Sequence, residues 1–179
     1  MKTALLVIDM QRALCTGDHA AFDIERVTER INGLSARARA AGAPVVLVQH
    51  EEGEGRLQFG SASWQLADGL VTAVSDLRVR KTTPNSFHRT ELQGQLQARG
   101  VDRLVVCGLQ SDFCVDTTVR RALALGYDVV LVADGHSTLD NGVLSAEQIV
   151  AHHNATLANM TSFGARMEVA PASDVRIGA

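Results

Sequence analysis

Four runs of apolar residues predict buried β-strands. They are Ala4 to Ile8, Val45 to Val48, Leu104 to Val106 and Val129 to Val132. Each run is continuous and does not alternate with polar residues, which is typical of a parallel sheet covered on both faces. Two further strands are expected around Arg78 to Lys81 and Met167 to Ala170.

Helix-like segments lie between these strands. They cover Phe22 to Ala41, Thr90 to Arg99, Cys114 to Leu125 and Ser145 to Met160. The first three end before Gly42, Gly100 and Gly126, and glycine readily adopts the left-handed conformation that closes a helix. The alternation of strand and helix predicts right-handed crossovers in a doubly wound α/β sheet. The stretch from Glu51 to Ser63 has no periodicity and is expected to form a surface loop beside the site.

Length and composition fit one domain. The chain has 179 residues, of which 46% are hydrophobic and 21% charged, and this size suits a single core. The net charge of −3 and the scattered Lys and Arg residues argue against a nucleic-acid partner. Apolar runs stay below the roughly 18 residues of a membrane span, and the start Met1-Lys2-Thr3 is unlike a signal peptide. We therefore expect one domain over residues 1–179, a cytoplasmic location and no membrane partner.

Polar residues that follow the predicted strands form the candidate site. In open parallel sheets, ligands bind outside the carboxyl ends of the strands. The residues expected at that edge are Asp9, His50, Lys81, Cys114 and Asp134. A carboxylate, an amine and a thiol from different parts of the chain are thus expected to meet in one pocket.

Cys114 is the candidate nucleophile. The three cysteines, Cys15, Cys107 and Cys114, form no C-x-x-C pair, which fits neither a disulfide framework nor a zinc knuckle. Cys114 is expected at a helix N-terminus, where backbone N–H groups and the helix dipole favour a thiolate and can hold an oxyanion. The alternative is that Cys114 is a small buried hydrophobe. Cys107 falls within an apolar strand and Cys15 follows a turn, so both are expected to be structural or incidental.

Three motifs together resemble the isochorismatase-like cysteine hydrolases over nearly the whole chain. They are Leu6-Val7-Ile8-Asp9-Met10-Gln11, Arg80-Lys81-Thr82 and the stretch from Val106 to Val115. That superfamily includes nicotinamidases, N-carbamoylsarcosine amidase, streptothricin hydrolase and isochorismatase. The resemblance implies a Rossmann-like, three-layer α/β/α fold with a mostly parallel six-stranded sheet.

The resemblance also implies the roles of individual residues. Asp9 would be the general base and acid, Lys81 would orient and stabilise the charges, and Cys114 would be the nucleophile. A cis peptide would join Leu109 to Gln110, and the backbone N–H groups of Gln110 and Cys114 would form the oxyanion hole. The expected reaction is hydrolysis of a small amide, carbamoyl or lactam C–N bond through a thioester, with no cofactor.

The segment after the second strand departs from the metal motif of nicotinamidases. Those enzymes carry Asp-x-His there, whereas this chain reads Val48-Gln49-His50-Glu51-Glu52. Neighbouring residues of an extended chain point apart, and no second His stands at a ligand-like offset. We therefore expect no metal site, with His50 and Glu51 or Glu52 as the alternative ligands.

Substrate contacts are expected from His50 and from three aromatic residues. Aromatic residues make up only 4% of the chain, and Trp64, Phe87 and Phe113 are the candidate pocket walls. Core packing is the alternative for each of them.

Two later motifs are expected to have structural roles. Asp134 to Thr138 could touch substrate, but turn formation or helix capping explains it more simply. His152-His153-Asn154 lies mid-helix, where neighbours face different ways, so packing or subunit contact is expected. By resemblance, the expected partners are a small-molecule substrate and further copies of the chain in a homodimer or larger homo-oligomer.

Two other functions compete with amide hydrolysis. One is vinyl-ether hydrolysis of isochorismate with release of pyruvate, which in this superfamily needs no cysteine nucleophile. The other is a redox sensor or interaction module in which a low-pKa Cys114 is oxidised to a sulfenate. The substrate itself stays open, because loops and neighbouring subunits form the pocket walls and one fold hosts many substrates.

Overall fold

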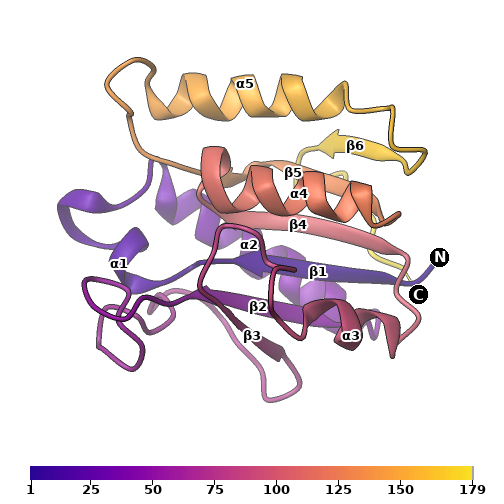
Figure 1. Ribbon diagram of the computed structural model, residues 1–179, viewed down its shortest axis with the longest axis horizontal. Coiled ribbons are helices and arrows are strands. Elements are labelled where there is room, and N and C mark those ends of the chain that lie inside the picture. Colours follow the sequence, from indigo (N-terminus) through magenta and orange to yellow (C-terminus); the bar gives the residue numbers. More distant parts are fainter. Residues whose placement is uncertain (179) are drawn as a thin grey trace.

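The computed structural model describes residues 1–178 and contains a six-stranded parallel sheet (Figure 1). Its strands are β1 (Thr3–Ile8), β2 (Val45–His50), β3 (Leu77–Lys81), β4 (Arg103–Leu109), β5 (Asp128–Ser137) and β6 (Met167–Ala170). Their spatial order is β3-β2-β1-β4-β5-β6, and each neighbouring pair is parallel. The strand order reverses between β1 and β4, which is the kind of position where open α/β sheets bind ligands. The predicted Rossmann-like fold is confirmed.

The predicted helices are present, with shorter ends than expected. They are α2 (Ile24–Ala40), α3 (Leu92–Gln97), α4 (Asp116–Ala124) and α5 (Ala146–Ala158). The short α1 (Arg12–Cys15) and a 3-10 turn at Gly17–His19 precede α2. A π-helical turn, Ser111–Val115, precedes α4, so Cys114 lies in this turn and not at the first residue of a regular helix. No helix in the described part of the chain combines the length and apolar character that a bilayer span requires.

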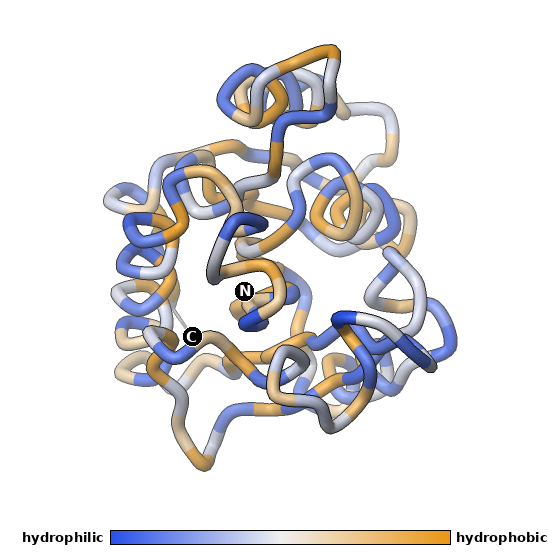
Figure 2. Tube along the Cα trace, turned by 90° about the vertical axis from the view of Figure 1, so that its left-hand side faces the viewer, coloured by the Kyte–Doolittle hydropathy of each residue, from blue (hydrophilic) through white to orange (hydrophobic). Residues whose placement is uncertain are grey.

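Both faces of the sheet are apolar, which explains the continuous hydrophobic runs. On one face, Leu5 and Val7 pack with Ile31 and Leu34 of α2. On the other face, the sheet packs against α3, α4 and α5 through apolar residues that include Leu96, Val119 and Leu157. Figure 1 shows α2 behind the sheet and α3 and α4 in front of it. Figure 2, which looks along the strands, places α2 on the left and α4 on the right, each with hydrophilic and hydrophobic positions alternating along the coil.

A glycine lets β1 and β4 approach closely near the carboxyl edge. Gly108 has a φ of +113°, and a Cβ atom at this position would lie 2.1 Å from the backbone oxygen of Ile8. No side chain fits such a gap, and this φ is accessible mainly to glycine. The residue that follows Ile8 is Asp9, so the close approach brings the end of β1 next to the end of β4.

Strand β5 carries an irregularity that changes what lies at its end. Its pairing with β4 passes from Val106 opposite Leu131 directly to Gly108 opposite His136. The extra residues of β5 form a bulge, which re-aims side chains beyond it. As a result, His136 lies beside Gly108 and close to the turn that carries Cys114.

Candidate active site

The side chain of Lys81 lies at the centre of the candidate site. Lys81 ends β3 and is only 2% exposed, whereas Arg78 and Arg80 on the same strand are exposed. Its Nζ donates to Asp9 Oδ2 at 2.7 Å and lies 3.2 Å from Cys114 Sγ. It also lies 3.1 Å from Nδ1 of His50. An ammonium has three protons, so all three contacts can be made at once.

Asp9 follows β1 in a conformation that few residues adopt. Its φ is +51°, in the left-handed region where Asp and Asn are the most tolerated residues after glycine. The backbone N–H of Asp9 donates to the carbonyl of Val48 at 2.9 Å. The side chain is 1% exposed; Lys81 binds Oδ2, and Oδ1 has no hydrogen-bond partner within residues 1–178. This free oxygen is available to take a proton.

Cys114 is partly buried, and its thiol needs a base before it can attack. The peptide bond between Leu109 and Gln110 is cis, as the family resemblance implied. Burial first and Asp9 second raise the pKa of Cys114 to about 12, with Lys81 acting in the opposite direction. Desolvation beside a carboxylate thus acts against the thiolate that the expected helix N-terminus would favour. The resting thiol is protonated at neutral pH.

His50 ends β2 and accepts a hydrogen bond from Lys81. Because the ammonium can only donate, His50 Nδ1 is the acceptor, and the neutral ring carries its proton on Nε2. Burial and, next, the charge of Lys81 lower the pKa of His50, in keeping with a neutral ring.

Gln11 holds the backbone of His50 at both of its polar groups. Gln11 Nε2 donates to the carbonyl of His50 at 3.0 Å, and Gln11 Oε1 accepts from the N–H of His50 at 2.8 Å. The sequence alone assigns Gln11 no role, although it stands two residues after Asp9 in the first motif. Its place two residues after Asp9 was the one available signal.

One group of metal-type ligands occurs within residues 1–178. Asp9, His50 and Cys114 offer an oxygen, a nitrogen and a sulfur atom that lie within 4.8 Å of one another. Lys81 Nζ contacts all three residues, so the ammonium already serves as their cation. A divalent ion would sit directly against that positive charge. The residues fit an ion-paired group of acid, amine and thiol better than a metal centre.

A family model decides how this chain is classified. The model described as "Isochorismatase domain" matches residues 3–170. The chain belongs to the isochorismatase family. The matched range contains all six strands and the residues Asp9, Lys81 and Cys114.

Individual relatives agree with this assignment. Streptothricin hydrolase from Streptomyces noursei is 42% identical over 138 residues, which cover 76% of this chain and 50% of that protein. Ureidoacrylate amidohydrolase RutB from Caulobacter vibrioides is 30% identical over 169 residues, covering 74% of this chain and 75% of that protein. A crystal structure of an isochorismatase family protein is 40% identical, with a TM-score of 0.86 over 93% of this chain and 96% of the other. The chain spans about half the length of the streptothricin hydrolases it matches.

The aromatic candidates of this isochorismatase-family chain have different surroundings. Phe87 is 8% exposed, lies in the core and stacks on Tyr127 with ring centroids 5.9 Å apart, which favours core packing. Phe113 precedes the cysteine of the site and is 55% exposed. Trp64 is partly buried, and its carbonyl accepts from Gln11 Nε2 at 2.8 Å. Trp64 and Phe113 thus remain the candidates for pocket walls.

Asp134 does not join the group around Lys81. It lies inside β5, which extends to Ser137, and not beyond the strand as expected. Its Oδ1 accepts from the N–H of Ala172 at 2.7 Å, and its Oδ2 lies 3.1 Å from Arg30 Nε. The expectation that Asp134 stands at the sheet edge is wrong because the bulge lengthens β5. Asp134 instead ties α2 and the C-terminal segment to the sheet.

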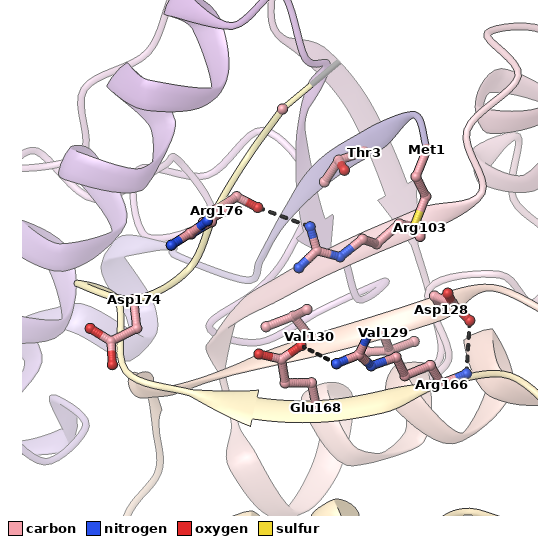
Figure 3. A pocket seen from close by; sticks show the side chains of 11 residues that line it. Met1, Thr3, Arg103, Asp128, Val129, Val130, Arg166, Glu168, Asp174 and Arg176 are labelled. Atoms are coloured by element: carbon pink, nitrogen blue, oxygen red, sulfur yellow. Dashed lines mark hydrogen bonds and ion pairs between the residues drawn. The ribbon is translucent and has the colours of Figure 1, made fainter.

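A cavity of about 500 Å³ lies at the opposite end of the sheet from the candidate site (Figure 3). It adjoins the amino ends of β1, β4, β5 and β6. Its charged lining consists of Arg103, Arg166, Arg176, Asp128, Glu168 and Asp174, so positive and negative charges balance. Arg103 donates to the carbonyl of Arg176, and the N–H of Arg166 donates to Asp128. No cysteine lines this cavity, and the candidate catalytic residues lie at the carboxyl edge of the sheet instead.

Proposed function

We propose that the protein is a cysteine hydrolase that cleaves a C–N bond of a small amide, carbamoyl or lactam substrate. The observation that carries the proposal is Lys81 Nζ, which lies 2.7 Å from Asp9 Oδ2 and 3.2 Å from Cys114 Sγ. The amidohydrolase among the relatives supports an amide-type substrate. In this account, Asp9, Lys81 and Cys114 form the catalytic triad.

The first half of the cycle forms a thioester. Asp9 takes the proton of the Cys114 thiol, for which its unpartnered Oδ1 is the available oxygen. The sulfur adds to the substrate carbonyl carbon, and the carbonyl π electrons move to oxygen to give a tetrahedral oxyanion. When the carbonyl re-forms, the C–N bond breaks, and Asp9 returns its proton to the leaving nitrogen. Lys81 keeps a positive charge beside the sulfur and the carboxylate throughout.

The second half of the cycle releases the acid product. Asp9 takes a proton from water, and the hydroxide oxygen adds to the thioester carbonyl carbon. The C–S bond then breaks, and the proton held by Asp9 returns to the sulfur of Cys114. Atoms and charges balance without any cofactor.

Neighbouring groups would bind the substrate around this centre. The backbone N–H groups of Gln110 and Cys114 are the proposed oxyanion hole, because Gln110 directly precedes the turn that carries the sulfur and Cys114 lies within it. His50 Nε2, the protonated nitrogen of its ring, is a proposed donor to the substrate, with Trp64 and Phe113 as apolar walls. The other proposed partners are further copies of the chain, in a homodimer or larger homo-oligomer.

The competing functions make different demands on Cys114. A redox sensor needs a thiolate at neutral pH, whereas burial and Asp9 raise the pKa of Cys114 to about 12. Vinyl-ether hydrolysis does not need the sulfur and releases pyruvate. Each alternative therefore gives its own experimental result.

The test is a substrate panel with cysteine variants. Metal-stripped protein is incubated with small amides, carbamoyl compounds, lactams and isochorismate while ammonia, amine and pyruvate are measured. We expect amine or ammonia release that disappears in Cys114→Ala and persists in Cys15→Ala, since Cys15 ends α1 and takes no part in the Lys81 contacts. Pyruvate release that survives in Cys114→Ala would contradict the proposal.

A further inference from the structure

We propose that His136 is a positioning residue that fixes the turn carrying Cys114, acting through the hydroxyl of Ser111. His136 lies in β5 and is 2% exposed, and Ser111 opens the π-helical turn and is fully buried. Ser111 Oγ and His136 Nδ1 are 2.7 Å apart. The catalytic meaning of this contact rests on the proposed cysteine hydrolase function, whereas its effect on the thiol does not.

The direction of each hydrogen bond follows from the next residue in the network. Asn154 Nδ2 donates to the carbonyl of Ala133 at 2.9 Å, which leaves Asn154 Oδ1 facing His136 Nε2 at 3.0 Å. Reversing the amide would set its oxygen against the carbonyl oxygen of Ala133, two acceptors in contact. His136 Nε2 therefore carries the proton, Nδ1 is bare, and the Ser111 hydroxyl donates to it.

The surroundings keep the ring of His136 neutral. Burial lowers the pKa of His136 to about 4, and the positive charge that His153 can carry acts in the same direction. The hydrogen bond to Asn154 and the charge of Asp134 oppose this effect without cancelling it. A neutral ring has one donor and one acceptor nitrogen, so the network has a single arrangement at working pH.

The network holds the turn at the residue that begins it. The N–H groups of Phe113 and Val115 both donate to the carbonyl of Gln110 at 3.1 Å, which ties the turn to its own start. Ser111 then links that start to β5, and Cys114 follows three residues later in the same turn. The 3.2 Å contact between Cys114 Sγ and Lys81 Nζ depends on where this turn sits.

A second contact anchors the same turn to the same strand end. Asp112 Oδ1 accepts from Thr138 Oγ1 at 2.6 Å. Consecutive side chains of the turn, Ser111 and Asp112, thus bind His136 of β5 and Thr138 directly after β5. The bulge in β5 is what brings His136 opposite Gly108, within reach of Ser111.

A pair of substitutions distinguishes the hydrogen bond made by Nδ1 of His136 from the one made by Nε2. Asparagine can place its side-chain oxygen where Nδ1 stands, so His136→Asn keeps the acceptor for Ser111. Glutamine reaches the position of Nε2, so His136→Gln keeps the partner of Asn154 and removes the acceptor for Ser111. Ser111→Ala removes the donor itself, and His152→Asn, at an exposed position of α5, is the matched control.

Two readouts test the proposal on the whole folded chain. The first is the pH dependence of Cys114 alkylation by iodoacetamide, followed by peptide mass spectrometry, which needs no substrate. The second is kcat and KM on any amide that the panel identifies. Melting temperatures within a few degrees of the native value identify the folded variants.

We expect His136→Gln and Ser111→Ala to lower kcat about tenfold or more with little change in KM, because a misplaced sulfur loses its near-attack geometry. In both variants the pH midpoint of alkylation should fall from its raised native value toward the roughly 8.5 of a free thiol, as Cys114 leaves Asp9. His136→Asn should restore most of kcat and the high midpoint, and His152→Asn should match the native protein.

Several outcomes would overturn the positioning role. Native alkylation profiles in both His136→Gln and Ser111→Ala would do so, and so would equal losses in His136→Asn and His136→Gln. If Ser111→Ala does not fold, the comparison of the two His136 variants decides. If the native protein turns over no amide while the alkylation profiles separate as expected, the positioning role holds and only the proposed function fails.

Discussion

At the residue scale, the proposed mechanism depends on a buried ion pair. Asp9 and Lys81 have side chains that are 1% and 0% exposed, with Oδ2 and Nζ 2.7 Å apart. Removing one member of such a pair leaves a buried charge without compensation, whereas removing both charges is much less costly. The pair is therefore expected to matter for stability as well as for catalysis.

Single substitutions should reveal this coupling. Asp9→Asn and Lys81→Met are each expected to lower the free energy of unfolding by about 3–5 kcal/mol and to abolish turnover. The double variant Asp9→Asn/Lys81→Met should regain part of the stability and none of the activity. Urea denaturation measures the unfolding free energies.

The neighbouring Arg80 supplies the control for this prediction. It is exposed, pairs with Glu51 at 3.5 Å and lies over the ring of Phe59 at 4.3 Å. Arg80→Met should therefore cost only about 1 kcal/mol. If Asp9→Asn were no more destabilising than Arg80→Met, the pair would not be the buried, dry contact described.

At the element scale, the site depends on how closely β1 and β4 approach. A Cβ at position 108 would lie 2.1 Å from the backbone oxygen of Ile8, and the φ of +113° disfavours any side chain. Gly108→Ala should thus lower the free energy of unfolding by more than about 4 kcal/mol or prevent folding.

A second glycine provides the matched comparison for strand packing. Gly33 lies within α2, and a Cβ there would meet no atom within 4 Å. Gly33→Ala should raise the free energy of unfolding by about 0.5–1 kcal/mol, because alanine is the better helix former. Thermal unfolding of both variants checks the contrast, and a well-folded Gly108→Ala would contradict the strand spacing.

The elements themselves were predictable because their patterns are local, whereas the site was predictable only in part. Continuous apolar runs located β1, β2, β4 and β5, and the resemblance singled out Lys81 from a cluster of cations. The link from Ser111 to His136 was missed because it joins residues 25 apart in the sequence. Its geometry depends on a bulge that no apolar pattern reports. The same bulge explains the misplacement of Asp134.

At the scale of the whole molecule, burying a neutral histidine makes folding depend on pH. Burial lowers the pKa of His136 to about 4, from 6.5 in the unfolded chain. Between these values the unfolded chain binds a proton that the folded chain does not. Stability should therefore fall as the pH drops from about 6.5 toward 4, with a contribution on the order of 3 kcal/mol.

His136→Asn should remove this part of the pH dependence. Urea denaturation at several pH values from 7 to about 4.5 would compare it with the native protein and with His152→Asn, whose exposed side chain lies on α5. We expect the native protein and His152→Asn to lose stability in parallel on acidification, and His136→Asn to lose less. Identical slopes in all three proteins would show that His136 is not a buried neutral group.

Acylation of Cys114 during turnover is the step on which the proposed mechanism depends, and rapid-quench mass spectrometry detects it. Protein is mixed with whichever amide, carbamoyl compound or lactam it turns over, quenched in acid during the reaction, digested and analysed peptide by peptide. We expect an adduct with the mass of the acyl group on the peptide that contains Cys114. The adduct should be absent from the peptides of Cys15 and Cys107 and from the Cys114→Ala protein. Turnover that continues in Cys114→Ala, with no cysteine carrying an adduct, would contradict the proposed mechanism.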